Sequence, residues 1–264
     1  MCRTTIRSWI LGALLALSGL PALAQKAPAE DPKTRIAKAE AMFQERCKKA
    51  GEFIHKTAKN VEGILLLKIR EQTSRGDQYR MDDPYGHDSW GDEYIKSFLY
   101  GRNVKGTLTI DGRGVSKGYS YVDALDPKDG KRYRYTGRIE EPWQRDKSYL
   151  KGYTRFVLNK ILAPDSAPRY GVTYDDISTK EERDYWIAGS SLKVLDLKTN
   201  EVMAERIGYM MDRGQGNNSG GRAAWLLAAD YACPEFPPDG SGHKYQGEQT
   251  RRFVEKILRP SLER

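Results

Sequence analysis

A disulfide between Cys47 and Cys233 would close most of this chain into one loop. The sequence of 264 residues holds three cysteines, and Cys2 lies in an N-terminal segment that we expect to be removed. In an oxidising compartment the remaining pair is expected to crosslink, tying an N-terminal helix to the C-terminal region. The chain-entropy model assigns closure of so long a loop roughly 5 kcal/mol. The alternative, Cys47 as a nucleophile with His55, has no neighbouring sequence that would reliably activate the thiol.

The first 24 residues have the pattern of an export signal. Two arginines precede an apolar run over residues 9–20, and Ala22-Leu23-Ala24 supplies the small residues that signal peptidase recognises. We predict cleavage of residues 1–24 before Gln25, and a single exported globular domain over residues 25–264, in a bacterial periplasm or secreted. A membrane anchor is disfavoured because the apolar run is only about a dozen residues long.

Charge and composition limit the classes of partner. Removing the signal lowers the formal net charge from +8 to +6, and no arm dense in lysine and arginine follows. Nucleic-acid binding is therefore not favoured. After the N-terminus no apolar run reaches the length of about 18 residues that a membrane-spanning helix needs, so no span is expected after cleavage. Aromatic residues make up 10% of the chain, which favours a folded core.

Hydrophobic periodicity predicts one α+β domain with a twisted, mainly antiparallel sheet. Apolar residues at spacings of three and four predict an amphipathic N-terminal helix between Pro32 and Gly51. A short C-terminal helix is predicted over residues 249–258, a short helix over 94–100 and a helical patch over 222–231. Period-two alternation predicts strands over residues 106–111, 118–126, 132–139, 186–197 and 201–212.

Turn residues predict how some strands connect. Hairpins are expected at residues 126–130 and 198–201, and a further hairpin is expected to join residues 52–57 to 61–70 through a turn at 58–60. The run Ile64–Leu67 is so apolar that its strand should be buried on both faces. Residues 72–94 and 214–221 are expected to be loops.

Catalytic motifs are weak. The sequence has no H-E-x-x-H and no G-x-S-x-G, and S-x-x-K occurs at Ser190/Lys193 and Ser148/Lys151 without the accompanying motifs of serine acyltransferases. The glycine-rich stretch 214–221 lacks the Lys-Ser/Thr ending of a phosphate loop. We therefore predict no catalytic residue and no cofactor.

An acidic stretch lies between residues 82 and 93. Its carboxylates are Asp82, Asp83, Asp88, Asp92 and Glu93, and His87 lies among them. Clustered oxygens in a turn-rich loop suit Ca²⁺, but the spacing matches no calcium-loop pattern, so we expect a solvated loop and no metal. The alternative use of two carboxylates as the acid and base of a glycosidase needs a cleft that sequence cannot show.

Residues 131–156 interleave cations with aromatic rings. Tyr133 and Tyr135 are expected on one strand face, and Arg132 and Arg134 on the other, pointing outward. Such a surface would hold an anionic or sugar polymer, or an acidic protein, through charge and ring stacking. The alternative is that the rings are core and the cations only a solvated face. The candidate binding residues are Arg132, Arg134, Trp143, Tyr149 and Lys151.

These patterns favour an exported, non-enzymatic binding or protein-interaction protein, of which an inhibitor or immunity type is one subclass. Its expected partner is an envelope protein or an anionic or sugar polymer. The alternative is a cell-envelope hydrolase that uses paired carboxylates from residues 82–93 or Asp175 and Asp176.

Overall fold

The structure of the chain is a computed structural model. It describes residues 30–71, 81–100, 109–110, 113–114, 118–140, 155–238, 242 and 244–261. The predicted signal segment and its cleavage site lie outside the described residues. All elements given below belong to one compact unit that begins at Pro32.

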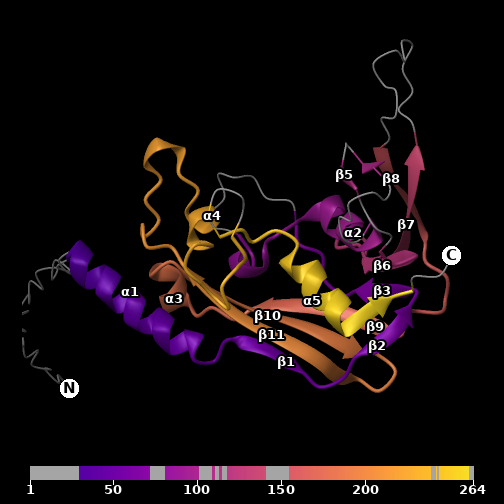
Figure 1. The fold of residues 1–264 in the computed structure, drawn as a ribbon, viewed down its shortest axis with the longest axis horizontal. Helices are drawn as coiled ribbons and strands as arrows, with labels where there is room; N and C mark the ends of the chain where they lie inside the picture. Colours follow the sequence, from indigo (N-terminus) through magenta and orange to yellow (C-terminus); the bar gives the residue numbers. More distant parts are fainter. Residues whose placement is uncertain are drawn as a thin grey trace, which may run out of the picture. The chain divides into compact units, whose positions relative to one another are not determined.

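A mixed sheet forms the centre of this unit (Figure 1). Within the described residues it has nine strands, in the order β1-β11-β10-β9-β3-β6-β7-β8, and β12 pairs with β11. These strands are β1 (Gly51–Ile54), β3 (Gly63–Leu66), β6 (Tyr121–Leu125), β7 (Arg132–Glu140), β8 (Arg155–Leu162), β9 (Tyr170–Asp176), β10 (Ile187–Asp196), β11 (Glu201–Met211) and β12 (Ala232–Cys233). The predicted α+β class is confirmed.

The sheet is mixed because β3 lies between two antiparallel groups. It pairs in parallel with β6 on one side and with β9 on the other, whereas the remaining neighbours in this sheet pair antiparallel. All four residues of β3 are buried. The predicted burial on both faces is confirmed, and a continuous apolar run is what a strand covered on both sides requires.

The predicted hairpin between residues 52–57 and 61–70 is wrong. Residues 58–60 belong to β2 (Ala58–Val61), which pairs in parallel with β13 (Leu258–Pro260), and β1 pairs with β11. Both hydrogen-bonding edges of β3 are taken by β6 and β9, so no edge of β3 remains for β1.

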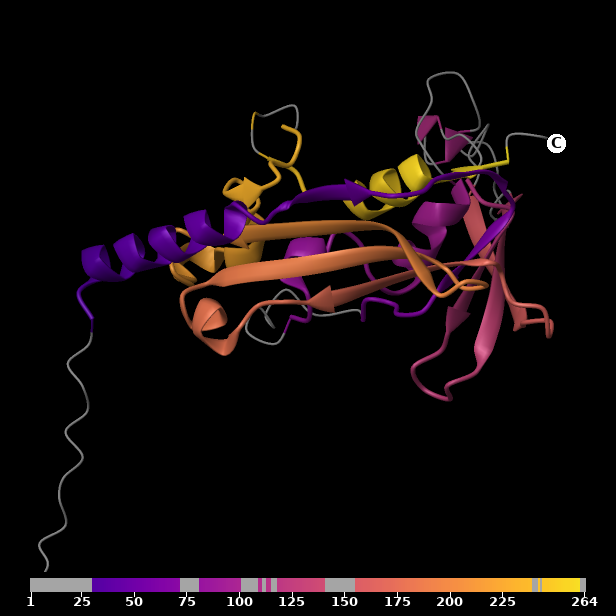
Figure 2. The same ribbon diagram turned by 90° about the horizontal axis from the view of Figure 1, so that it is seen from below.

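The other predicted hairpins are confirmed. β6 and β7 pair antiparallel across residues 126–131, and β10 and β11 pair across residues 197–200. In the second hairpin Val194 lies opposite Ala204 and Leu195 opposite Val202. Figure 2 shows β10 and β11 as long neighbouring strands. The sequence patterns did not indicate β8 and β9. β4 (Thr109–Ile110) and β5 (Arg113–Gly114) pair with each other, and β4 falls within the predicted strand 106–111.

Helices cover the sheet. They are α1 (Pro32–Cys47), α2 (Gly91–Tyr100), α3 (Lys180–Asp184), α4 (Ala224–Ala228) and α5 (Gln249–Ile257). Short 3₁₀ turns are η1 (Pro84–Gly86) and η2 (Ser219–Gly221). The inward side chains of α2 and α5, among them Phe98 and Phe253, share one core cluster with β3, β6 and β9–β11. These two helices therefore lie on the same face of the sheet (Figure 1). No helix among the described residues is long and apolar enough to cross a membrane.

The N-terminal helix is present, with a narrower buried face than predicted. Ala39 and Phe43 are buried, whereas Ile36 and Cys47 are only partly buried. The predicted disulfide is confirmed: Cys47 at the end of α1 is bonded to Cys233, and their Cα atoms are 5.5 Å apart. Because Cys233 lies opposite Tyr209 of β11, the bond fastens α1 to the sheet.

Candidate functional site

Two of the five carboxylates in the acidic stretch, Asp83 and Asp88, are buried, whereas Asp82, Asp92 and Glu93 are exposed as the sequence predicted. Asp83 has no exposed side-chain surface and Asp88 has 2%, and α2 already begins at Gly91. Both carboxylates lie close to Arg70, which follows β3 and is 1% exposed. The expectation failed because charged side chains can be buried when an opposite charge meets them inside the protein.

Arg70 is the centre of this buried cluster. Its Nη2 donates to Asp83 Oδ2 at 2.7 Å, and its Nη1 lies 3.9 Å from Asp88 Oδ1. The guanidinium carbon lies 4.2 Å from the ring centre of Tyr174 and 5.1 Å from that of Tyr94. Arg70 Nε is buried and makes no hydrogen bond to a described residue.

The backbone of η1 leaves room for the ion pair between Arg70 and Asp83. Asp83 takes a left-handed conformation, with φ 49°, and its Oδ1 accepts from the Gly86 amide at 3.3 Å. A Cβ atom on Gly86 would lie 2.2 Å from Arg70 Nη2 and 2.3 Å from Asp83 Oδ2. Only glycine leaves room for the pair at this position.

The C-terminal helix holds the second carboxylate. Asp88 accepts from the Thr250 amide at 2.8 Å and from the Thr250 hydroxyl at 3.0 Å, in the first turn of α5. Burial raises the pKa of Asp83 and Asp88, and the nearby Arg70 charge opposes that shift. The cluster thus joins the end of β3, η1 and α5, and its carboxylates are engaged inside the protein.

His87 is a buried imidazole without a hydrogen-bonding partner. Its side chain is 8% exposed, and neither Nδ1 nor Nε2 makes a hydrogen bond to a described residue. The ring stacks on Trp90 with centres 5.1 Å apart. Burial, together with the Arg70 charge, lowers the pKa of His87 to about 4, although Asp82 opposes the shift. At pH 7 the ring is therefore neutral and presents one donor and one acceptor.

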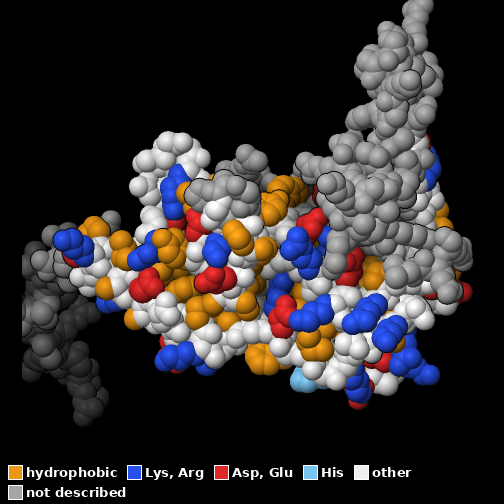
Figure 3. Space-filling model, in the orientation of Figure 1, with side chains coloured by type: hydrophobic (Ala, Val, Ile, Leu, Met, Phe, Trp, Pro, Cys, Tyr) orange, Lys and Arg blue, Asp and Glu red, His pale blue; other side chains and the backbone are white. Residues whose placement is uncertain are grey.

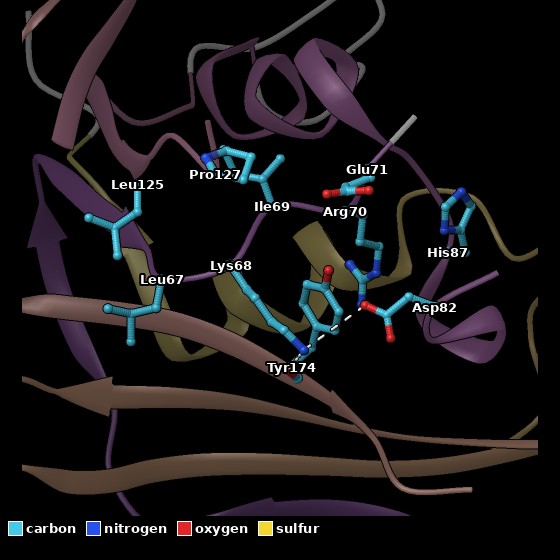
Figure 4. Close-up of a pocket in the computed structure, with 10 residues that line it drawn as sticks. All are labelled: Leu67, Lys68, Ile69, Arg70, Glu71, Asp82, His87, Leu125, Pro127 and Tyr174. Atoms are coloured by element: carbon cyan, nitrogen blue, oxygen red, sulfur yellow. Dashed lines mark hydrogen bonds and ion pairs between the residues drawn. The ribbon is translucent and has the colours of Figure 1, made fainter. Parts of the chain in front are cut away.

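A cavity of about 450 Å³ lies beside this cluster, where β3 ends (Figure 4). Figure 4 shows an apolar side formed by Leu67, Ile69, Leu125 and Pro127, and a charged side formed by Lys68, Arg70, Glu71, Asp82 and His87, with the Tyr174 ring between them. We call this the first cavity. Because β3, β6 and β9 run in parallel, residues that end or follow these strands meet at this edge of the sheet.

Lys68 and Asp82 face each other on the charged side of the first cavity. Lys68 Nζ lies 4.0 Å from Asp82 Oδ2, at the limit of a direct ion pair, and donates to the Tyr174 carbonyl oxygen at 3.3 Å (Figure 4). The Lys68 side chain is 45% exposed and that of Asp82 is 61% exposed. These two charges, unlike those of Arg70 and Asp83, remain accessible to a bound molecule.

A second cavity, of about 540 Å³, adjoins the first and shares Ile69, Arg70, Glu71 and Pro127 with it. Its other lining residues are Gly91, Asp92, Ile95, Asp126, Lys128, Tyr135 and Lys160. Lys160 Nζ donates to Asp126 Oδ2 at 2.7 Å and lies 3.9 Å from the ring centre of Tyr133. Part of the predicted basic and aromatic region therefore borders this cavity.

The predicted binding residues on β7 are engaged by a buried carboxylate. Arg134 donates to Asp123 from Nε at 2.7 Å and from Nη2 at 3.1 Å, and Arg132 Nη1 lies 3.5 Å from the same carboxylate. Asp123 has no exposed side-chain surface, and the two arginines are 17% and 18% exposed. The cations are thus largely withdrawn from solvent. Trp143, Tyr149 and Lys151 lie outside the described residues.

Tyr135 is buried in the core and Tyr133 packs against it, as expected for the ring-bearing face of the strand. Ser190 and Lys193, the S-x-x-K match on β10, are three positions apart on a strand and so face opposite sides of the sheet. Ser148 lies outside the described residues.

The stretch 214–221 is organised by one buried carboxylate. Asp212, 1% exposed, accepts from the amides of Gly214 and Gly216 at 3.0 and 2.8 Å. It also forms an ion pair with Arg222 that closes the loop. A Cβ atom on Gly216 would meet the Trp186 ring at 2.1 Å, so this glycine is needed for packing.

The other acidic groups are dispersed. Asp175 lies 3.4 Å from Lys193, and Asp176 accepts from the Ser178 amide at 2.8 Å. Across the described part of the chain, no group of three or more His, Cys, Asp or Glu side chains is placed to hold a metal ion. On the face shown in Figure 3, lysine and arginine side chains lie among aspartates and glutamates.

The sequence patterns indicated His87 and Asp82 as candidate residues. They did not indicate Arg70, Lys68 or Tyr174. The one available signal was the alternation of cations with apolar residues in Leu67-Lys68-Ile69-Arg70, directly after a buried strand. Comparison with protein-family models, with curated proteins and with solved structures finds no match to this chain.

Proposed function

We propose that this chain is an exported, non-enzymatic binding protein, periplasmic or secreted, whose ligand is a small polar molecule in the first cavity. The observation that carries the proposal is the pair of accessible charges Lys68 and Asp82. Their side chains are 45% and 61% exposed, and both line the first cavity beside apolar side chains. A few placed polar groups on an otherwise apolar wall are typical of small-molecule sites.

The cavity has the size and the lining of a ligand site. Small-molecule sites commonly measure about 300–1,000 Å³ and combine apolar walls with a few placed polar groups. The first cavity measures about 450 Å³, with Leu67, Ile69 and Leu125 on its apolar side.

Binding is favoured over catalysis because two of the five carboxylates of the acidic stretch are engaged inside the protein. Asp83 is paired with Arg70 and Asp88 with Thr250. The expected role of Arg132 and Arg134 in binding a polymer or an acidic partner stays a prediction, and the structure adds that both already contact Asp123.

The test is ligand-induced stabilisation. A panel of amino acids, dicarboxylic acids and mono- and disaccharides would be screened by thermal unfolding at pH 7, with binding checked by native mass spectrometry. A ligand at 100 times its Kd stabilises by about 2.7 kcal/mol, which for a chain of this size is a shift of several degrees.

Variants assign the stabilisation to the first cavity. Lys68→Gln, at a half-exposed position, removes the accessible ammonium charge and should abolish most of the shift. Lys180→Gln, at an exposed lysine on α3, is the matched control and should keep the shift. If Lys68→Gln fails to fold, Asp82→Asn replaces it. A panel without any shift, or a shift that survives Lys68→Gln and Asp82→Asn, would overturn the proposal.

A second candidate function is hydrolysis, since Glu71 and Asp82 line the first cavity together with a neutral imidazole. Two carboxylates across one cleft can supply the acid and the base of glycoside hydrolysis. Release of reducing ends from envelope polysaccharide by the wild type, and its loss in Glu71→Gln and Asp82→Asn, would establish this function instead.

A further inference from the structure

The geometry points to a zwitterion of amino-acid or dipeptide size, with an apolar side chain, as the ligand of the first cavity. This inference rests on the proposed function and specifies the ligand that the same site accepts.

The charged side of the first cavity offers both signs of charge within a short distance. Lys68 Nζ and Asp82 Oδ2 are 4.0 Å apart, and Glu71 also lines the cavity. Arg70 is 1% exposed and its charge is matched by Asp83. A ligand carboxylate is suited to Lys68, and a ligand ammonium group to Asp82 and Glu71. A ligand that carries only a positive or only a negative charge would place that charge near a residue of the same sign, Lys68 or Asp82.

The contact between Lys68 and Asp82 is weak enough to open. Both side chains are about half exposed, 45% and 61%, and an ion pair of this kind contributes only about 0–1 kcal/mol. A molecule that carries both charges replaces this single contact with two.

The apolar side of the cavity accounts for the rest of the ligand. Leu67, Ile69, Leu125 and Pro127 lie opposite the charged end, and the Tyr174 ring separates the two (Figure 4). A volume of about 450 Å³ lies within the range of about 300–1,000 Å³ that is common for small-molecule sites. That size fits an aliphatic amino acid or a dipeptide.

The experiment is calorimetric titration at pH 7 with leucine, leucinamide and N-acetylleucine. Leucinamide lacks the carboxylate and N-acetylleucine lacks the ammonium charge. Each should bind at least tenfold more weakly than leucine. Leucyl-leucine, which keeps both charges, should bind detectably.

Two charge-deletion variants should change the affinities for the three compounds in different ways. Asp82→Asn should weaken leucine and leucinamide but leave N-acetylleucine unchanged, because that compound has no ammonium charge to lose. Lys68→Gln should weaken leucine and N-acetylleucine but leave leucinamide unchanged. Lys180→Gln and Asp184→Asn, which break an exposed ion pair of 2.7 Å on α3, are matched controls and should change none of the affinities.

The outcomes separate the two proposals. Equal affinity for leucine and both derivatives, or uniform weakening in both variants, would overturn the zwitterion. If neither leucine nor leucyl-leucine binds but another class of the panel does, with loss in Lys68→Gln, the zwitterion is rejected and the binding function stands. If no compound of the panel binds, both are rejected.

Discussion

The acidic stretch around η1 and the β6-β7 hairpin both bring arginine against aspartate, but at different depths. Arg70, Asp83 and Asp88 are each at most 2% exposed, whereas Arg132 and Arg134 keep 17% and 18% of their surface around the buried Asp123. Removing one partner from a buried pair leaves a charge without water or counterion, while a partly exposed pair can be rescued by solvent. Breaking the deeper cluster is therefore expected to cost more stability than breaking the pairs around Asp123.

The largest effect is expected at the deeper cluster. Arg70→Met should lower the free energy of unfolding by about 3–5 kcal/mol, because Asp83 would lose its buried counterion. Arg169→Met is the matched control: it breaks a pair with Asp196 in which the arginine is 55% exposed, and should cost at most about 1 kcal/mol. Urea unfolding measures both. Equal losses would show that depth does not distinguish these pairs.

The stability contributed by the disulfide can be compared with that of both regions, because Cys47 and Cys233 pack in a separate core cluster. Replacing both with serine should cost about 2–5 kcal/mol, because the unfolded chain gains the freedom that the crosslink removes. Chemical unfolding of the oxidised and the double-serine proteins checks this. A loss below about 1 kcal/mol would indicate that the unfolded chain is already compact.

The third prediction concerns how the free energy of unfolding changes with pH because of His87. Its pKa of about 4 lies below the ordinary 6.5, so between these values the unfolded chain binds the proton more readily. Stability should therefore fall as pH drops from about 6.5 towards 4, by at most roughly 3 kcal/mol from this group.

The raised pKa values of Asp83 and Asp88 increase stability as pH falls, which opposes the effect of His87. The contribution of His87 is therefore measured as the difference between the wild type and a variant without this histidine. Unfolding free energies at pH 7 and 4.5 should differ less in His87→Phe than in the wild type. His55→Phe should keep the wild-type slope, and identical slopes in all three proteins would assign the pH dependence to other groups.

The smallest effect is expected on the β6-β7 hairpin. Arg134→Gln should cost about 1–2 kcal/mol, because Asp123 loses two charge-assisted hydrogen bonds but keeps Arg132 at 3.5 Å. Arg138→Gln, on the same strand but 60% exposed, should be nearly neutral and serves as the control. A cost for Arg134→Gln as large as that for Arg70→Met would remove the contrast between the two regions.

Local patterns in the sequence were enough for much of the fold. Alternation and turn residues indicated β6-β7 and β10-β11, and spacings of three and four indicated α1 and α5. The cysteine count indicated the disulfide. The helices and strands depend on neighbours along the chain, so their patterns are visible in a single sequence. The disulfide was predictable because only two cysteines remain once Cys2 is set aside.

Tertiary structure alone decided where β3 lies and what became of the acidic stretch. Pairing of β3 with β6 and β9 left no edge for β1, and no local pattern encodes that competition. Asp83 and Asp88 resemble solvated carboxylates in sequence and are buried because Arg70 and Thr250 reach them from other elements. The tertiary structure likewise decides that Lys68 and Asp82 stay accessible at one cavity and that His87 is buried beside them. Desolvation and pairing depend on distance in space and not on spacing along the chain.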